Sequence, residues 1–180
     1  MKHYSKLKET KISSKTLYRG VLGVKLDEVK LLNGNTSTRL YFDHRGASGI
    51  LPVEDGQVYL VQQYRYPIHQ ATWEIPAGKR EKGQTFLMCA KAELKQETGL
   101  TAKKLKEMMM FHPCNAFSNE EQHLYLATGL IRGEDQPDED EFLNLKKFPL
   151  KTAYKMIADG TITDAKTILA LQWYRLHCAE

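Results

Sequence analysis

The sequence predicts an α+β domain, with strands on both sides of one central helix. Three observations carry this prediction. Two hairpin signals, Asn33-Gly34 and Asp55-Gly56, separate short apolar runs in the first third of the chain. A segment rich in helix-forming residues follows over 85–98. From about residue 150 onward, the remaining chain again has helical patterning.

The N-terminal part predicts a small β-sheet. Residues 16–32 alternate loosely between apolar and polar positions and are interrupted by glycines, which indicates β-structure. Asn33-Gly34 then marks a turn, so we expect the return strand over 36–43. The first fifteen residues hold five lysines and one glutamate, and we interpret that stretch as a solvated, partly frayed terminus.

The remaining elements follow the same signals. A second hairpin pairs 49–53 with 58–64 around Asp55-Gly56. The central helix spans 85–98, and Gly99 is placed to end it. After it we expect strands over 105–111 and 123–128, an acidic loop over 135–141, and helices over 150–159 and 164–178.

The composition of this 180-residue chain is that of an ordinary globular protein, with 42% apolar and 27% charged residues. Its length suits one domain with a substantial core. No apolar run approaches the ~20 residues of a membrane span, and the start lacks the apolar core of a signal peptide. The three cysteines have no CxxC spacing and leave an odd one, which favours reduced thiols. We therefore expect a cytoplasmic protein with no membrane partner.

The net charge of +4 raises the question of nucleic-acid binding. The excess lies largely in the lysine-rich terminus, without the interleaved aromatic residues that a stacking surface needs. We therefore expect no nucleic-acid partner. The six histidines show no spacing typical of zinc ligands, so we do not expect zinc either.

Two glutamates of the central helix, Glu93 and Glu97, are four residues apart. On an α-helix this spacing puts both carboxylates on one face, where their repulsion costs roughly a few tenths of a kcal/mol. Such a pair can be a solvated helix face, or it can bind a cation. Oxygen ligands on a rigid helix suit Mg²⁺, which is held by one or two carboxylates together with substrate phosphates.

The segment 78–100 resembles the Nudix box, a family pattern of glycines, glutamates and one arginine on a loop and a helix. The matching positions are Gly78, Glu93, Leu94, Glu97, Gly99 and Leu100. The departures are Gln84 for a glutamate, Ala92 for the arginine and Gln96 for another glutamate. In the family the first glutamate and the arginine support one another as a charge pair, so this chain lacks that pair. Gln96 brings a neutral amide oxygen to the helix face of Glu93.

Flanking residues narrow the resemblance. Trp73-Glu74-Ile75-Pro76-Ala77-Gly78 runs into the box, and Gln63-Tyr64-Arg65-Tyr66 precedes it. This combination resembles the ADP-ribose and nucleoside diphosphate sugar pyrophosphatase branch of the Nudix hydrolases. The resemblance implies a Nudix α/β/α sandwich with a mixed sheet over 46–180. It also implies a small antiparallel sheet within 1–45, through which two copies of the chain form a homodimer.

The resemblance implies a set of site residues as well. The metal ligands for Mg²⁺, or for Mn²⁺ in its place, are oxygen donors on or beside the helix: the carbonyl of Ala77, Glu93, Gln96 and Glu97. The general base comes from the acidic loop, as Glu141 with Glu139 as an equal rival. The substrate contacts are Arg65, Trp73 and Glu74, joined by Tyr18 and Arg19 from the N-terminal sheet. Without the resemblance, Arg65 fits a surface strand, Trp73 fits the core, and the acidic loop is merely solvated.

The expected reaction is Mg²⁺-dependent hydrolysis of the diphosphate bond of a nucleoside diphosphate sugar, such as ADP-ribose or GDP-mannose. Its products are a nucleoside monophosphate and a sugar phosphate. Asn115 stands where ADP-ribose pyrophosphatases carry a proline, which weakens ADP-ribose as the sole substrate. A second hypothesis is a non-catalytic Nudix-fold sensor that binds ADP-ribose or a nucleotide sugar. The three departures in the box favour the sensor, whereas the retained Glu93 and Glu97 favour the enzyme.

Overall fold

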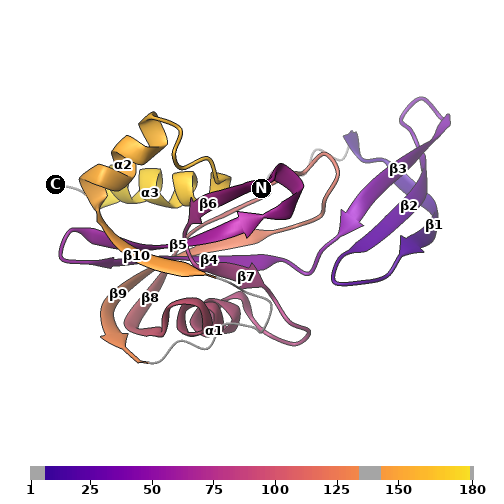
Figure 1. Ribbon diagram of the computed structural model, residues 1–180. Coiled ribbons are helices and arrows are strands. Elements are labelled where there is room, and N and C mark those ends of the chain that lie inside the picture. Colours follow the sequence, from indigo (N-terminus) through magenta and orange to yellow (C-terminus); the bar gives the residue numbers. More distant parts are fainter. Residues whose placement is uncertain (1–6, 134–142, 179–180) are drawn as a thin grey trace. The chain divides into compact units, whose positions relative to one another are not determined.

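The structure is a computed structural model, and it describes residues 7–133 and 143–178 (Figure 1). Contacts divide the described chain into two compact units. The small unit holds the chain up to His44 together with His112–Glu121, and the main unit holds the rest. The chain therefore crosses between the units at three points: after His44, before His112 and after Glu121.

The small unit contains a three-stranded antiparallel sheet in the order β1-β2-β3. β1 is Thr10–Tyr18, β2 is Gly23–Lys30, and β3 is Thr36–Asp43, the last with the predicted bounds. The turn between β2 and β3 follows the Asn33-Gly34 signal. Gly34 has φ +89°, a left-handed conformation that glycine adopts without strain.

The end of β3 is bound by the segment His112–Glu121. The Phe42 N–H donates to the Phe117 carbonyl (2.8 Å), and the two rings meet edge to face with centroids 6.4 Å apart. Asn119 donates from Nδ2 to the Asp43 carboxylate (2.9 Å). The small unit is thus built from two separate stretches of sequence.

The prediction of a frayed N-terminus is wrong from Thr10 onward. β1 pairs with β2 along its length, from Thr10 opposite Lys30 to Tyr18 opposite Val24. Every residue of β1 is nevertheless exposed. The lysine-rich composition therefore reports side chains that face water, while the backbone beneath them is paired in a sheet. Residues 1–6 lie outside the described part of the chain.

The main unit contains a seven-stranded mixed sheet in the order β10-β5-β4-β9-β8, with β6 paired to β5 and β7 paired to β4. The pair β4 and β9 is parallel, and the other pairs are antiparallel. A single 3-10 turn, η2 (Tyr66–Ile68), joins β5 to β6. The strands are β4 Ala47–Glu54, β5 Gln57–Arg65, β6 Gln70–Glu74, β7 Ala77–Lys79, β8 Leu100–Phe111, β9 Gln122–Arg132 and β10 Asn144–Pro149.

Three strands of this sheet, β6, β7 and β10, escape the sequence prediction. β7 has only three residues and lies where Pro76-Ala77-Gly78 indicates a turn, but the structure pairs it with β4. β10 is largely polar, and Phe148 is its one buried residue. Short or polar strands are held in place by their neighbours in the sheet, so the local sequence carries little sign of them.

Helices cover both faces of the main sheet (Figure 1). α1, Phe86–Thr98, packs on one face, whereas α2, Leu150–Ala158, and α3, Ala165–His177, pack on the other. Successive residues of β4 serve the two cores, because Ile50 joins the cluster of α1 and Leu51 joins that of α2 and α3. This is the α/β/α sandwich that the resemblance implies. In the described part of the chain, no helix is long and apolar enough to cross a membrane.

Candidate metal and phosphate site

Helix α1 has a defined start and a defined end. Thr85 precedes it, and the Thr85 hydroxyl accepts a hydrogen bond from the Met88 N–H (3.1 Å). Gly99 ends the helix in the left-handed conformation (φ 67°), as the sequence predicts. With both ends fixed, the helix face that carries Glu93 and Glu97 lies against β7.

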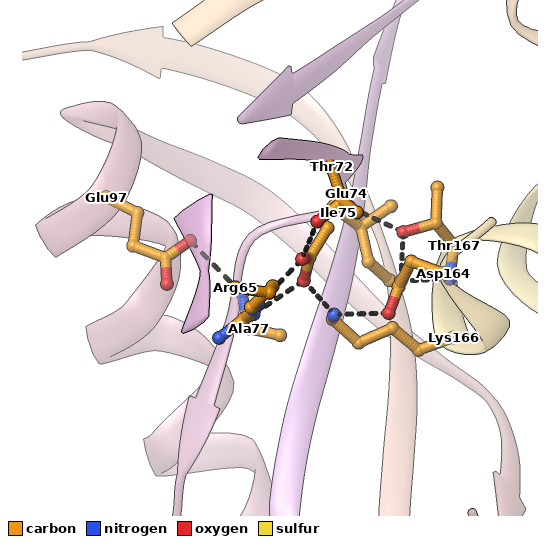
Figure 2. A network of polar contacts seen from close by, with 9 residues as sticks. All are labelled: Arg65, Thr72, Glu74, Ile75, Ala77, Glu97, Asp164, Lys166 and Thr167. Carbon is orange, nitrogen blue, oxygen red and sulfur yellow. Dashed lines mark hydrogen bonds and ion pairs between the residues drawn. The ribbon is translucent and has the colours of Figure 1, made fainter. Parts of the chain in front are cut away.

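Strand β7 brings main-chain atoms close to both carboxylates. A Cβ atom at Gly78 would lie 2.2 Å from the carboxyl carbon of Glu93, so a side chain there would displace the Glu93 carboxyl group. The Ala77 N–H donates to Glu97 Oε2 (3.2 Å; Figure 2), and Glu97 is only 6% exposed. The structure therefore brings together Ala77, Glu93 and Glu97, three of the four metal ligands expected from the sequence.

The donor set at α1 fits a divalent cation that is shared with a ligand. Glu93 and Glu97 are two carboxylates about one helical turn apart, and Gln96 is half-buried beside them. Among residues 7–133 and 143–178, no group of three or more His, Cys, Asp or Glu side chains could hold a metal ion. Mg²⁺ needs no such cage, because waters and substrate phosphates complete its coordination. The close approach of Gly78 to Glu93 shows where the backbone makes room for the pair.

Cys89 lies in the same helix but has a packing role. It is fully buried, and its thiol donates to the Gly78 carbonyl (3.5 Å). Burial raises the pKa of the Cys89 thiol to about 11, so it stays protonated near neutral pH. All three cysteines are free thiols, as the sequence indicates: Cys89, Cys114 and Cys178.

A second polar cluster surrounds Glu74 at the end of β6 (Figure 2). Glu74 is 2% exposed, and Arg65 binds it through two hydrogen bonds, from Nε to Oε1 (2.7 Å) and from Nη2 to Oε2 (2.6 Å). The Thr72 hydroxyl and the Lys166 ammonium also donate to this carboxylate. Burial favours the neutral acid, but the hydrogen bonds and positive charges of Arg65 and Lys166 outweigh it and lower the pKa of Glu74 to about 2.

The start of α3 completes this cluster. Asp164 caps the helix, because its Oδ2 accepts from the Thr167 N–H (3.0 Å) and the Thr167 hydroxyl (2.6 Å). Its Oδ1 accepts from Lys166 Nζ (2.9 Å). The Thr167 hydroxyl also accepts from the Ile75 N–H (2.8 Å), just after β6. The C-terminal helix is thereby tied to the chain that leads into β7.

Sequence reasoning missed Lys166, Asp164 and Thr167 as members of the site. One signal could have found Lys166. The first turn of a helix carries a partial positive charge that disfavours a cation, so a lysine there indicates an anionic partner. The sequence alone does not say that the partner is Glu74, which precedes Lys166 by 92 residues.

The structure assigns different positions to the predicted substrate contacts. The Arg65 side chain is 42% exposed, while Glu74 is buried behind it and holds its guanidinium. Trp73 packs edge-on against Phe148, with ring centroids 4.9 Å apart, at the margin of the core. Tyr18 and Arg19 are exposed residues of the small unit.

Two further predictions lie elsewhere. Glu139 and Glu141, the candidate general bases, fall outside the described residues. Asn115 lies in the segment His112–Glu121, which belongs to the small unit rather than to the main sheet. The described part of the candidate site therefore consists of α1, β7 and the Arg65 cluster.

Comparison with known proteins identifies the family to which this chain is similar. The family model described as the NUDIX domain matches residues 43–171. An ADP-ribose pyrophosphatase from Bacillus subtilis (strain 168) is 37% identical over 174 residues, which cover 94% of each chain. A methanol dehydrogenase activator from Bacillus methanolicus is 36% identical over 172 residues, or 93% of each chain. A solved structure of an ADP compounds hydrolase superimposes with a TM-score of 0.84 over 96% of this chain and 97% of its own, and at 20% identity it supports the fold alone.

Proposed function

The chain belongs to the NUDIX family, within its ADP-ribose pyrophosphatase branch, and from this premise we propose that it hydrolyses the diphosphate bond of a nucleoside diphosphate sugar with Mg²⁺. ADP-ribose and GDP-mannose are the substrates to test first, and the products are a nucleoside monophosphate and a sugar phosphate. The observation that carries the proposal is the pair of carboxylates on α1, Glu93 and Glu97, held against main-chain atoms of β7.

The metal ligands that we propose are the two carboxylates, the Gln96 amide oxygen and the Ala77 carbonyl. A bound Mg²⁺ or Mn²⁺ would supply positive charge at the diphosphate and would acidify a water molecule. The chain itself contributes rigidity, because both carboxylates project from one capped helix and Gly78 lets β7 approach it closely. Gln96 adds an oxygen ligand without a charge, so the negative charge that α1 offers comes from Glu93 and Glu97.

Arg65 is the residue that we propose to bind the substrate phosphates. Glu74 occupies its Nε and Nη2, and this bidentate contact fixes the plane of the guanidinium. The hydrogen bond with Glu74 raises the pKa of Arg65, so the cation stays charged. Its exposed edge keeps N–H groups for phosphate oxygens. Glu74 in this arrangement orients Arg65 from behind.

The general base is proposed to be Glu141, with Glu139 as its rival. An acidic side chain near a metal-bound substrate is suited to take a proton from water. Replacing each glutamate separately by glutamine separates the two. One variant should lose far more turnover than the other, and if neither loses turnover the base lies elsewhere in the chain.

We also propose that a second copy of the chain covers one face of the small sheet. Leu40 and Phe42 lie on the same face of β3 and are 57% and 43% exposed, so this face offers apolar surface to a partner. Light scattering with size-exclusion chromatography should find a dimer for the wild type and a monomer for Leu40→Asp. A monomeric wild type would reject the dimer. In the dimer, Tyr18 and Arg19 are the residues that we expect to contact the substrate.

The second candidate function is a sensor that binds a nucleotide sugar without cleaving it. Gln84, Ala92 and Gln96 favour this alternative, since each removes a charge from the box. One relative of similar identity is named as an activator of another enzyme. We favour catalysis because the chain retains the two carboxylates that a metal-assisted hydrolysis most needs, Glu93 and Glu97, and both lie beside β7.

One experiment decides between the two candidates. The protein is incubated with Mg²⁺ and a panel of nucleotide sugars, and a phosphatase releases inorganic phosphate from the products. Wild type is compared with Glu97→Gln and with Glu54→Gln, a control that changes the same charge where it pairs with Lys147. If the protein is an enzyme, wild type and Glu54→Gln should both turn over substrate, and Glu97→Gln should lose turnover. Ligand binding without turnover in all three proteins supports the sensor.

A further inference from the structure

Arg80 lies in the loop between β7 and α1 and binds only main-chain carbonyls among its described hydrogen-bond partners. Its Nε donates to the Arg45 carbonyl (2.9 Å), and its Nη1 donates to the Gln84 carbonyl (3.1 Å). Its backbone N–H donates to the Gly46 carbonyl (2.9 Å). One side chain thus connects the loop to the chain that enters β4. A planar guanidinium is suited to this role, because it carries several donors in a fixed arrangement.

The same guanidinium caps a column of stacked rings. Its central carbon lies 4.5 Å from the ring centroid of Phe86, the first residue of α1. The opposite neighbour of Phe86 is His123 of β9, with centroids 3.7 Å apart and planes 18° apart. His123 Nδ1 lies 2.7 Å from Glu107 of β8. Arg80 therefore also connects the loop to the start of α1 and, through Phe86, to the main sheet.

These contacts bear on the metal site because of where Arg80 lies in the chain. Gly78 precedes it by two residues and Glu93 follows on α1, so the loop that Arg80 anchors sets the distance between β7 and the helix. Arg80 is the only arginine between β7 and the end of α1. Ala92 brings no guanidinium to the helix, and the Gln84 side chain closes the turn, where its Oε1 accepts from the Glu81 N–H (3.0 Å).

We propose that Arg80 is a positioning residue that holds β7 against α1 and thereby sets the geometry of the metal ligands Ala77, Glu93 and Glu97. This inference rests on the proposed function for its kinetic readout. Its metal-binding and exchange readouts do not depend on turnover. Arg80 acts through the loop and the start of the helix.

The test compares wild type with Arg80→Leu, Arg80→Lys and the control Lys82→Leu. Lys82 is an exposed cation of the same loop, so its replacement removes the same charge without touching these contacts. Mn²⁺ binding is measured by the loss of the free-ion electron paramagnetic resonance signal. Hydrogen exchange is followed by mass spectrometry on peptides covering residues 79–90. In a turnover assay, the Mg²⁺ concentration for half-maximal rate is measured separately from the substrate KM at saturating Mg²⁺.

We expect Arg80→Leu to weaken Mn²⁺ binding about tenfold, the lower end of what loss of an outer-shell partner costs. Exchange in the loop should rise, and the Mg²⁺ requirement should increase while the substrate KM at saturating Mg²⁺ stays unchanged. The Mn²⁺ affinity of Arg80→Lys should lie between those of wild type and Arg80→Leu, because an ammonium lacks the planar fork that reaches two carbonyls. Lys82→Leu should behave as wild type.

Wild-type Mn²⁺ affinity and loop exchange in Arg80→Leu would overturn the proposal. Should that variant fail to fold, Arg80→Lys and Phe86→Leu, which removes the stack alone, decide in its place; unchanged Mn²⁺ affinity in both overturns it. A wild type that binds Mn²⁺ but does not hydrolyse nucleotide sugars would reject the proposed function and leave this inference standing. If wild type hydrolyses nucleotide sugars and Arg80→Leu binds Mn²⁺ normally, the proposed function stands and the positioning role of Arg80 is rejected.

Discussion

Among the described residues of the main unit, two glutamates are buried, and their surroundings differ. Glu74 is 2% exposed and receives hydrogen bonds from Arg65 and Lys166, which help to hold its pKa at about 2. Glu97 is 6% exposed and accepts from the main-chain N–H of Ala77, one turn from Glu93. The first carboxylate lies between two cationic side chains. The second also attracts Arg65, but it has a like charge as its helical neighbour.

This difference supports our proposal that the α1 pair binds the metal ion. The charge of Glu74 is offset inside the protein, so the Glu74 cluster orients Arg65 and ties α3 to the sheet. Glu97 also attracts Arg65, but Glu93 and Glu97 repel one another, and a divalent cation at this pair would replace that repulsion by attraction. We therefore regard the Glu74 cluster as the support of the site and the α1 pair as its binding end.

The largest effect on this comparison should come from Glu74→Gln. The amide cannot satisfy two cations, and Lys166 is left buried without its main counter-charge, so the free energy of unfolding at pH 7 should fall by about 3 kcal/mol. Urea unfolding measures it. The control Glu54→Gln breaks a half-exposed pair and should cost at most about 1 kcal/mol. Equal losses in the two variants would contradict a supporting role for Glu74.

The stabilisation from Glu74 should also depend on pH. Its pKa falls from the ordinary value of 4.5 to about 2 on folding. A lowered folded pKa stabilises the protein fully above pH 4.5, and the contribution, of about 3 kcal/mol, is lost as the pH falls toward 2. The gap in unfolding free energy between wild type and Glu74→Gln should therefore narrow in urea titrations from pH 5 to pH 3. A gap that stays constant would assign the loss to packing.

At the binding end, Gly78→Ala should reduce turnover by about a hundredfold, or ~2.7 kcal/mol of activation free energy. The new methyl group would overlap the Glu93 carboxyl group and move it away from the proposed metal site. A matched control is Gly56→Ala at the β4–β5 turn, where a Cβ meets nothing within 4 Å and only the left-handed backbone is strained. Normal kinetics in Gly78→Ala would show that turnover does not depend on the observed position of the Glu93 carboxyl group.

The smallest effect should come from Gln96→Glu. A third carboxylate on the α1 face should increase Mn²⁺ affinity by roughly three- to tenfold, because affinity follows the charge of the ligand set. Without metal, the added repulsion should cost a few tenths of a kcal/mol, roughly the value of a like-charge helical pair. Isothermal titration and thermal unfolding measure the two changes. Unchanged affinity would show that position 96 faces away from the metal.

The sequence predicts those parts of the fold whose signals are local. The helix expected over 85–98 begins one residue later, at Phe86, because Thr85 and Gly99 mark its ends chemically. The Asp55-Gly56 turn has positive φ at both residues, as its dipeptide indicates. The carboxylate pair of the site belongs to this class, since helical spacing alone puts Glu93 and Glu97 on one face.

What the sequence does not predict depends on distant partners. Lys166 and Glu74 are 92 residues apart, and either residue by itself looks like a surface charge. Arg80 occupies a box position where the pattern specifies no residue type, yet its guanidinium anchors two carbonyls and a ring stack. Ion pairs and stacks of this kind are set by the packing of whole elements, so they become visible only in three dimensions.

Because the small unit is built from two segments of sequence, N-terminal truncation of the protein has a practical consequence. A fragment that starts at residue 46 removes β3 but retains Phe117 and Asn119, whose partners Phe42 and Asp43 are gone. Such a fragment would present an orphaned aromatic loop to solvent and tend to aggregate or to be clipped there. The N-terminal sheet therefore cannot be removed alone. A truncated protein should either keep both segments of the small unit or also replace the loop between β8 and β9.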